Sequence, residues 1–234
     1  MGERIQKLIA SAGLCSRRTA EQWIADGRVT VNGERAQIGQ SAEPDGDLVC
    51  VDGKPIEPVR EHRYLLLNKP RGYVTTLHDE RGRPTVAELV RSCGVRVYPV
   101  GRLDLDSEGL LLLTNDGVWM QKILHPRYEI NKIYHVTVAG DVQGADVRLA
   151  SLREIEGETI CPAEVKTLRS GRETAELEFI IHQGKNRQIR RMCAACNLHV
   201  KKLKRVQEHK LLLGDLKEGE WRDLTREEIL GFED

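Results

Sequence analysis

The sequence is poor in aromatic residues, which make up 4% of its 234 residues. Any stacking on nucleobases must therefore rest on one or two rings, not on an aromatic surface. The chain also lacks an excess of either charge, since 36 Lys and Arg balance 36 Asp and Glu. A net charge of zero argues against a protein that attracts a polyanion with its whole surface, but it leaves room for a local basic patch.

Disulfide-scaffold and membrane patterns are both missing from the sequence. The six cysteines are scattered, and no apolar segment typical of a secretion signal precedes them. This usage argues against a secreted disulfide scaffold and favours a reducing cytoplasm. No apolar run approaches the roughly 20 residues that cross a bilayer. We therefore expect a cytoplasmic protein with no membrane partner.

A small first domain is indicated by its turns and helices. Apolar residues at helical spacing predict helices at residues 4–12 and 16–27. Two short strands follow, each ending in an Asn-Gly or Asp-Gly turn. Residues 54–63 hold two prolines and show no periodicity, which is typical of a linker. We expect one domain at residues 1–60 and a second at 61–234.

Residues 101–113 set three alternating carboxylates against four consecutive leucines. Asp104, Asp106 and Glu108 alternate in a glycine-bracketed loop that leads into the buried strand Leu110–Leu113. Arg102 is near enough in sequence to keep a carboxylate ionised. Three chemistries fit: a magnesium site for phosphoryl transfer, an acid and base pair for glycoside hydrolysis, or one catalytic carboxylate beneath an extruded base. Because no second acidic cluster with a histidine accompanies the loop, we expect no metal.

Residues 182–210 hold a local excess of positive charge. Nine Lys or Arg stand there against the single acid Glu208, a net charge of +8. Such a segment favours a polyanion partner and salt-dependent binding. Cys193, Cys196 and His199 have ligand-like spacing, but one Cys-x-x-Cys pair is weak evidence for a metal, and we expect these cysteines to pack in a core.

The first domain resembles a known RNA-binding module shared with a small-subunit ribosomal protein. The resemblance lies in Gln6-Lys7, Ala12-Gly13, Ser16-Arg17-Arg18, Ala20-Glu21, Gly27-Arg28-Val29 and Val31-Asn32-Gly33. It implies RNA contact without sequence reading. The contacting residues would be Arg4, Lys7, Arg17, Arg18 and Arg28.

The second domain resembles the RsuA/RluB group of ribosomal RNA pseudouridine synthases. Four motifs carry the resemblance, namely Lys69-Pro70-Arg71-Gly72, Gly101-Arg102-Leu103-Asp104 with Ser107-Glu108-Gly109-Leu110, Lys132-Ile133-Tyr134, and Gly184-Lys185-Asn186-Arg187-Gln188-Ile189-Arg190-Arg191-Met192. Ser107 stands where the group usually has Thr, and Gln183 where Glu often precedes the glycine. The resemblance implies an α+β fold, with a mainly antiparallel mixed sheet flanked by helices and a small N-terminal α/β module.

Roles for individual residues follow from the same resemblance. Asp104 would be the catalytic carboxylate acting at the ribose, Tyr134 would stack on the base and serve as a general base, and Arg190 would pair with Asp104. Arg102, Lys132 and Leu203 would complete the substrate pocket. Further RNA contacts would come from Lys69, Arg71, Lys185, Arg187 and Arg191. Asp106 and Glu108 would shape the loop or lie in solvent, and no cofactor is implied.

These features together predict an enzyme that isomerises a specific uridine in large-subunit ribosomal RNA. The alternatives are a small-subunit enzyme of the same group and a noncatalytic RNA-binding protein of ribosome assembly. A metal-dependent nuclease would need the magnesium site that we do not expect. The expected partner is ribosomal RNA or a pre-ribosomal particle, bound by a monomer.

Overall fold

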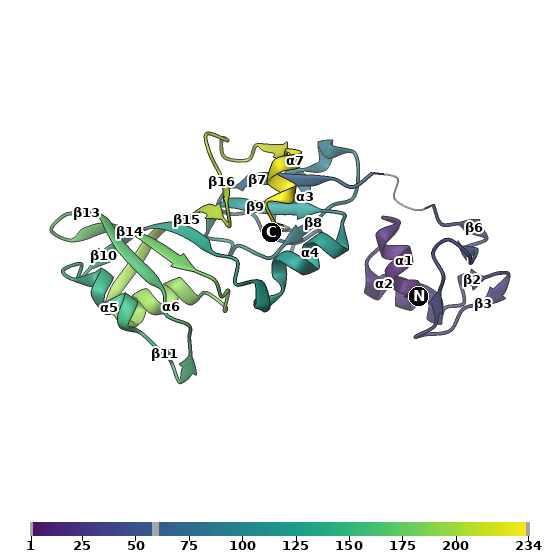
Figure 1. Ribbon diagram of the computed structural model, residues 1–234, viewed down its shortest axis with the longest axis horizontal. Coiled ribbons are helices and arrows are strands. Elements are labelled where there is room, and N and C mark those ends of the chain that lie inside the picture. Colours follow the sequence, from purple (N-terminus) through teal and green to yellow (C-terminus); the bar gives the residue numbers. More distant parts are fainter. Residues whose placement is uncertain (1, 58–60, 233–234) are drawn as a thin grey trace. The chain divides into compact units, whose positions relative to one another are not determined.

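The computed structural model describes residues 2–57 and 61–232 (Figure 1). It divides into one compact unit that ends at Arg63 and also holds Asn115–Gly117, and a second that holds Tyr64–Thr114 and the chain from Val118 onward. The boundary expected at residue 60 falls at residues 58–60, outside the described part. Among the described residues, no helix has the length and apolarity needed to cross a membrane.

The first unit packs two helices against a small sheet. Its helices are α1 (Ile5–Ser11) and α2 (Arg17–Ala25), and its strands are β1 (Glu3–Arg4), β2 (Val29–Val31), β3 (Glu34–Arg35), β4 (Ser41–Ala42), β5 (Val49–Val51) and β6 (Lys54–Pro55). The main sheet has the order β3-β2-β5-β6. Ser16 caps α2, because its hydroxyl accepts a hydrogen bond from the Thr19 amide at 3.1 Å. Ile5, Ile9 and Ile24 are buried at the centre of this unit.

The linker expected at residues 54–63 is wrong at its first two residues, which form strand β6. Asp52 and Gly53 adopt left-handed backbone with φ of 49° and 75°. Such a turn returns the chain onto β5 as a hairpin. Pro55 is tolerated there because β6 is an edge strand, where a missing N–H leaves no neighbour unpaired.

A nine-stranded sheet organises the second unit. The path of paired strands runs β13 (Glu164–Ser170), β14 (Thr174–Ile181), β10 (Lys132–Gly140), β15 (Leu198–Glu208), β9 (Glu108–Thr114), β7 (Tyr64–Lys69), β17 (Trp221–Asp223), with β16 (Leu211–Leu212) on β15 and β8 (Tyr98–Val100) on β9. Within the described residues β15 and β9 pair in parallel, and the other pairs of this sheet are antiparallel. The sheet is therefore mixed and mainly antiparallel, as expected.

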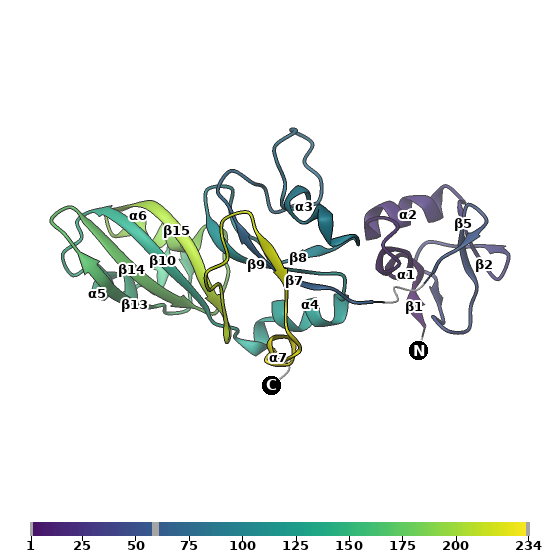
Figure 2. The same cartoon turned by 90° about the horizontal axis from the view of Figure 1, so that it is seen from above.

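Helices cover both faces of this sheet. They are α3 (Val86–Leu89), α4 (Gly117–Leu124), α5 (Ala145–Ser151), α6 (Gln188–Ala195) and α7 (Arg226–Leu230), with 3-10 turns η1 (Arg91–Cys93) and η2 (Pro126–Tyr128) and a small hairpin of β11 (Glu154–Ile155) and β12 (Glu158–Thr159). Figure 2 shows α3 on one side of β7 and β9, and α4 and α7 on the other.

The leucine run is buried because both faces of β9 are covered. Side chains alternate along a strand, so Leu111 and Leu113 join the larger core while Leu110 and Leu112 join a second core with Trp119. A strand covered on both sides needs an uninterrupted apolar sequence. All seven residues of β9 are accordingly buried.

The central strand β15 departs from the sequence-based expectation, which placed residues 198–208 in a basic segment with Leu203 in the pocket and predicted no strand there. Lysines and arginines fill four of its eleven positions, and this masks the alternation of its apolar residues. Leu198 and Leu203 nevertheless face the larger core.

The parallel contact between β9 and β15 requires a glycine. Gly109 has φ of +105°, and a Cβ atom added there would lie 2.2 Å from the Arg205 carbonyl oxygen. The atoms that the Cβ would meet belong to the Arg205 backbone, so no flexible side chain could move to relieve the collision. Gly109 therefore sets how closely the two strands approach.

We expect Gly109→Ala to lower the free energy of unfolding by about 3 kcal/mol or more, because collision and backbone strain add. Gly157→Ala is the matched control, since Gly157 has φ of +80° but open space around it. Strain alone should cost about 1 kcal/mol there. Urea unfolding of both variants measures the difference, and equal losses would show that the collision is relieved elsewhere.

Candidate active site

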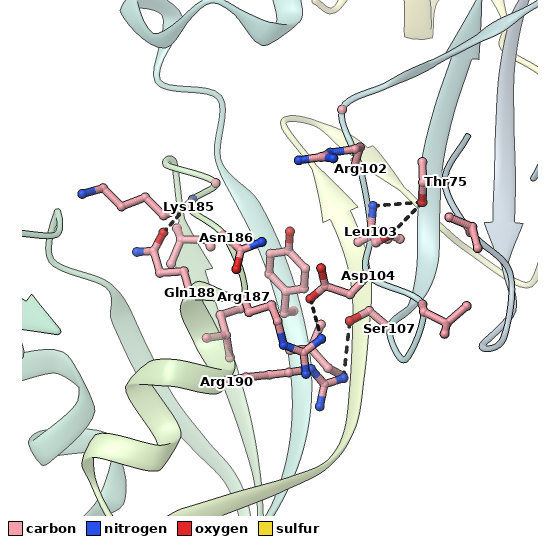
Figure 3. A pocket seen from close by; sticks show the side chains of 18 residues that line it. Thr75, Arg102, Leu103, Asp104, Ser107, Lys185, Asn186, Arg187, Gln188 and Arg190 are labelled. Carbon is pink, nitrogen blue, oxygen red and sulfur yellow. Dashed lines mark hydrogen bonds and ion pairs between the residues drawn. The ribbon is translucent and has the colours of Figure 1, made fainter. Parts of the chain in front are cut away.

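A cavity of about 460 Å³ opens in the second unit (Figure 3). Small-ligand sites typically have volumes of roughly 300–1,000 Å³. Its lining comes from places far apart in the sequence: residues 74–75, the loop 101–107, Tyr134 on β10, Ile181 on β14, residues 184–190 at the start of α6, and Leu203 on β15. Asp104, Tyr134, Arg190, Arg102 and Leu203, which the sequence singled out separately, all line it.

The loop 101–107 is fixed from below by a buried lysine. The Lys69 ammonium donates hydrogen bonds to the carbonyl oxygens of Pro70 at 3.1 Å, Asp104 at 3.0 Å and Ser107 at 2.9 Å. Lys69 has no exposed surface, so its expected contact with RNA phosphate is wrong. Burial lowers the pKa of Lys69 to about 8, although the nearby carboxylates of Asp104, Asp106 and Glu108 act in the opposite direction.

A threonine that the sequence did not single out holds the other side of this loop. The Thr75 hydroxyl donates to the Leu103 carbonyl at 2.6 Å and accepts from the Leu103 amide at 3.3 Å. This reciprocal pair fixes the backbone one residue before Asp104. No local sequence pattern connects residue 75 to residue 103, so the sequence carried no signal for it.

Asp104 faces an arginine other than the two expected. Figure 3 shows the Asp104 carboxylate facing Arg187, and Arg187 Nη1 lies 3.5 Å from Asp104 Oδ2. Neither Arg102 nor Arg190 makes an ion pair with Asp104 in the described part of the chain. The expected Arg190–Asp104 pair is thus wrong, because Arg190 lies almost one helical turn further along α6 and reaches a different carboxylate.

That carboxylate is Asp106. Arg187 donates to both of its oxygens at 2.9 Å, and Arg190 Nε lies 3.3 Å from Oδ2 while Nη2 donates to the Asp106 carbonyl at 2.8 Å. The hydrogen bonds from Arg187 hold the pKa of Asp106 below its ordinary value. Asp106, whose side chain is 35% exposed, is therefore an anchor for two arginines.

Tyr134 and Leu203 belong to the apolar lining of the cavity. Tyr134 is 8% exposed, and burial raises the pKa of its phenol. Lys132, expected in the pocket, does not line the cavity. Its ammonium donates to the Ile130 carbonyl at 3.1 Å and lies 4.0 Å from Glu208.

The basic segment is largely neutralised by local carboxylates. Arg191 donates hydrogen bonds to Glu156 and Glu158 at 2.9 Å, and Lys185 lies 2.8 Å from Glu158. Carboxylates of the β11–β12 hairpin therefore pair with both cations. Of the nine cations expected to attract RNA, six make ion pairs among the described residues. They are Lys185, Arg187, Arg190, Arg191, Lys202 and Arg205.

Two other sequence-based expectations have definite outcomes. Glu108, expected to shape the loop or lie in solvent, is 3% exposed and therefore not solvated; it begins the buried strand β9 and lies 3.0 Å from Lys202. Cys193 and Cys196 are buried on α6 and at its end, and burial raises the pKa of the Cys193 thiol to about 12. The described residues contain no cluster of three His, Cys, Asp or Glu that could hold a metal ion.

The first unit presents a second group of cations. Arg17 and Arg18 are exposed at the N-terminal end of α2, where free amides already favour an anion. Arg28 is held by Asp52, with Nε 3.0 Å from Oδ1, and lies 4.6 Å from the Trp23 ring centre. Lys7 pairs with Glu3. Arg4 and the exposed Arg71 of the second unit make no ion pair within the described ranges.

Comparison with known proteins gives consistent matches for both units. The family model described as RNA pseudouridylate synthase matches residues 63–195, and the S4 domain model matches residues 3–42. The chain is 41% identical to the ribosomal large subunit pseudouridine synthase B of Bacillus subtilis, over 97% of this chain and 94% of that protein.

Two further matches extend this result. The dual-specificity RNA pseudouridine synthase RluF of Escherichia coli is 40% identical over 97% of this chain and 77% of its own length. A crystal structure of a pseudouridylate synthase aligns with a TM-score of 0.70 and 30% identity, covering 98% of this chain and 99% of that one.

The burial of Lys69 predicts a pH-dependent stability. Its pKa is about 8 in the folded chain against an ordinary value of 10.5. Between these values the unfolded chain binds more protons, so the contribution of Lys69 to the free energy of unfolding rises with pH from about 8 to about 10.5. Urea unfolding of the wild type and Lys69→Met gives their free energies of unfolding. The value for the wild type, relative to that for Lys69→Met, should increase as the pH rises across this range. A constant difference between the two would contradict the lowered pKa.

Proposed function

Since the chain belongs to the RNA pseudouridylate synthase family, and is an RNA pseudouridine synthase, we propose that it isomerises a specific uridine of large-subunit ribosomal RNA with Asp104 as its catalytic carboxylate. The observation that carries the assignment of Asp104 is its place in the cavity, on a loop fixed by Lys69 and Thr75 and facing Arg187. The Arg187 guanidinium at this distance orients the carboxylate, as a nucleophile or base requires.

The reaction depends on how the substrate and the catalytic groups are positioned, and it consumes no second reagent. The bond between uracil N1 and ribose C1′ breaks, the base turns, and a bond between C5 and C1′ forms, so no atom is gained or lost overall. Asp104 acts at the ribose, and Arg187 and Arg190 hold the loop carboxylates in place. Tyr134 stacks on the base above Leu203 and is the candidate general base. Arg102 contacts the substrate at the cavity rim, Lys132 supports the pocket through Glu208, and we propose no cofactor.

RNA delivery is assigned to both units. We propose that residues 1–60 bind RNA and that residues 61–234 carry out the isomerisation. Arg4, Arg17, Arg18 and Arg71 are the first contacts, because no carboxylate among the described residues pairs with them. The remaining cations proposed from the sequence are paired, and each reaches phosphate only by leaving its carboxylate. They are Lys7, Arg28, Lys185, Arg187 and Arg191.

The large-subunit assignment is supported by the relative from Bacillus subtilis, whose name specifies the large ribosomal subunit. The small-subunit enzyme is the alternative within the family, and the dual-specificity relative adds the option of two RNA substrates. We propose that the protein acts in the cytoplasm as a monomer, on ribosomal RNA or a pre-ribosomal particle. Mapping of pseudouridine in large- and small-subunit transcripts after incubation with the enzyme separates these options, since a site confined to small-subunit RNA would overturn the proposal.

We expect Asp104→Asn to abolish uridine isomerisation, with a loss of at least about 10³-fold, while leaving the fold intact because the side chain is 35% exposed. Asp215→Asn is the matched control, since Asp215 is an exposed aspartate outside the cavity. Pseudouridine formation in a transcript and the urea unfolding midpoint are measured together. Undiminished isomerisation by Asp104→Asn would exclude this residue from the chemistry.

We expect the double change Arg17→Gln and Arg18→Gln to weaken RNA binding and to reduce the slope of log affinity against log salt by about 2. The rate of isomerisation at saturating RNA should stay unchanged, because neither residue lines the cavity. Filter binding at several salt concentrations gives the slope. An unchanged slope would mean that the end of α2 does not meet the backbone phosphates.

A further inference from the structure

A buried arginine lies beside Tyr134. Arg205 on β15 is the cross-strand partner of Tyr134 on β10, so the two side chains are neighbours on one face of the sheet. Arg205 is 2% exposed, so its charge is withdrawn from water. Burying an arginine costs free energy unless it is paired, and such groups often have a functional role.

A β-bulge places this arginine beside its counterion. Arg205 and Glu208 are three residues apart, so regular alternation would send them to opposite faces of the sheet. The pairing register shifts here, with Ile133 opposite Gln207 but Tyr134 opposite Arg205. One extra residue on β15 returns Arg205 and Glu208 to the same buried side. Bulges are common beside active sites because they redirect a side chain.

The resulting cluster places two cations around one buried carboxylate. Arg205 Nη2 lies 3.4 Å from Glu208 Oε2, and Lys132 lies 4.0 Å from the other oxygen of Glu208. Arg205 Nε donates to the Leu110 carbonyl at 2.7 Å. Neither Arg205 Nη2 nor Glu208 Oε2 has a hydrogen-bond partner among the described residues. Because Arg205 is buried, the low local dielectric screens the interaction of its positive charge with the Tyr134 phenol only weakly.

We propose that Arg205, held by Glu208, is a positioning residue that stabilises the ionised phenol of Tyr134, so that this oxygen takes the proton from C5 of the isomerised uracil. This inference rests on the proposed function. It assigns the reason for a buried cation cluster that the cavity itself does not include.

Protons and electrons balance in this step. The phenolate oxygen takes the C5 proton, and the electron pair of that C–H bond forms the C5–C6 double bond. The electron pair of the former C6–N1 double bond moves onto N1, which takes a proton from water. The phenol then returns its proton to water, so the enzyme and the net composition are unchanged.

The charges around Tyr134 fix the direction of the expected pH effect. Burial raises the pKa of the phenol and Arg205 lowers it, whereas Glu208 on β15 and Asp104 on the loop before β9 raise it. Lys132 on the same strand faces Glu208, and the β14 residue opposite Tyr134 is the apolar Phe179. Removing Arg205 therefore moves the ionisation of Tyr134 to higher pH. The single-turnover rate constant, which rises with pH as Tyr134 ionises, should then rise at higher pH as well.

The test measures single-turnover isomerisation and release of tritium from uridine labelled at C5, both against pH. Arg205→Met should lower the single-turnover rate constant on the order of 10²-fold near neutral pH and move the rise of this rate constant to higher pH, with RNA affinity nearly unchanged. Arg205→Lys should recover part of the rate, because it restores the charge.

In a Tyr134→Phe background, Arg205→Met should lower the rate constant little further, because the two residues act together. Arg169→Met is the matched control for loss of an arginine, since Arg169 is exposed on β13.

Folding failure is separated by a second variant and a measurement without RNA. The double change Arg205→Met and Glu208→Met removes both buried charges, which cores tolerate better than one unpaired charge. The tyrosinate absorbance titration of Tyr134, taken as wild type minus Tyr134→Phe, should move to higher pH in this double variant. A pH profile unchanged by Arg205→Met, or independent losses from Arg205 and Tyr134, overturns the inference. An inactive wild type, or an active Asp104→Asn, instead overturns the proposed function, while the titration still tests Arg205 independently of activity.

Discussion

The buried ammonium group of Lys69 is the constraint on which the site depends. Three backbone carbonyls converge on it, two of them from residues 104 and 107 of the loop that carries the proposed catalytic carboxylate. A loop held only by its own turn would leave Asp104 free to move between Arg187 and Arg190. With the backbone fixed at both of these residues, the loop keeps the Asp104 carboxylate near Arg187, which is a form of the preorganisation that catalysis in a cavity requires.

Charge in this protein is matched locally and not spread over a surface. Asp106 anchors Arg187 and Arg190, the β11–β12 hairpin anchors Arg191, and Glu208 anchors Arg205. The zero net charge of the sequence thus has a structural counterpart in these pairs. Exposed pairs of this kind contribute little stability, roughly 0–1 kcal/mol each, so a phosphate can displace a carboxylate from them at small cost. The buried Arg205 pair differs, because no solvent compensates its separation.

Much of this architecture was predictable where local patterns dominate. The leucine run indicated β9, and apolar residues at helical spacing indicated α1 and α2. Asp104, Tyr134 and Leu203 were singled out separately and do line one cavity. Strand β15 escaped prediction because Lys and Arg mask its apolar face, although Leu203 and Arg205 share a face by simple alternation. The Arg187–Asp104 pair and the bulge beside Arg205 depend on contacts about 70 to 80 residues apart in sequence, which no local rule supplies.

The parallel pairing of β9 with β15 also determines when the cavity exists. Gly109 meets Arg205 across most of the second unit's sequence, and residues 184–190 must dock before the loop carboxylates find their arginines. Contacts of such long sequence separation form late, because the entropy of closing the intervening chain must be met first. The first unit has its own core of nearby residues and can fold while the remainder is still being synthesised. A nascent chain that ends before β15 would therefore hold a folded RNA-binding unit without an assembled cavity, and would meet RNA before it could modify it.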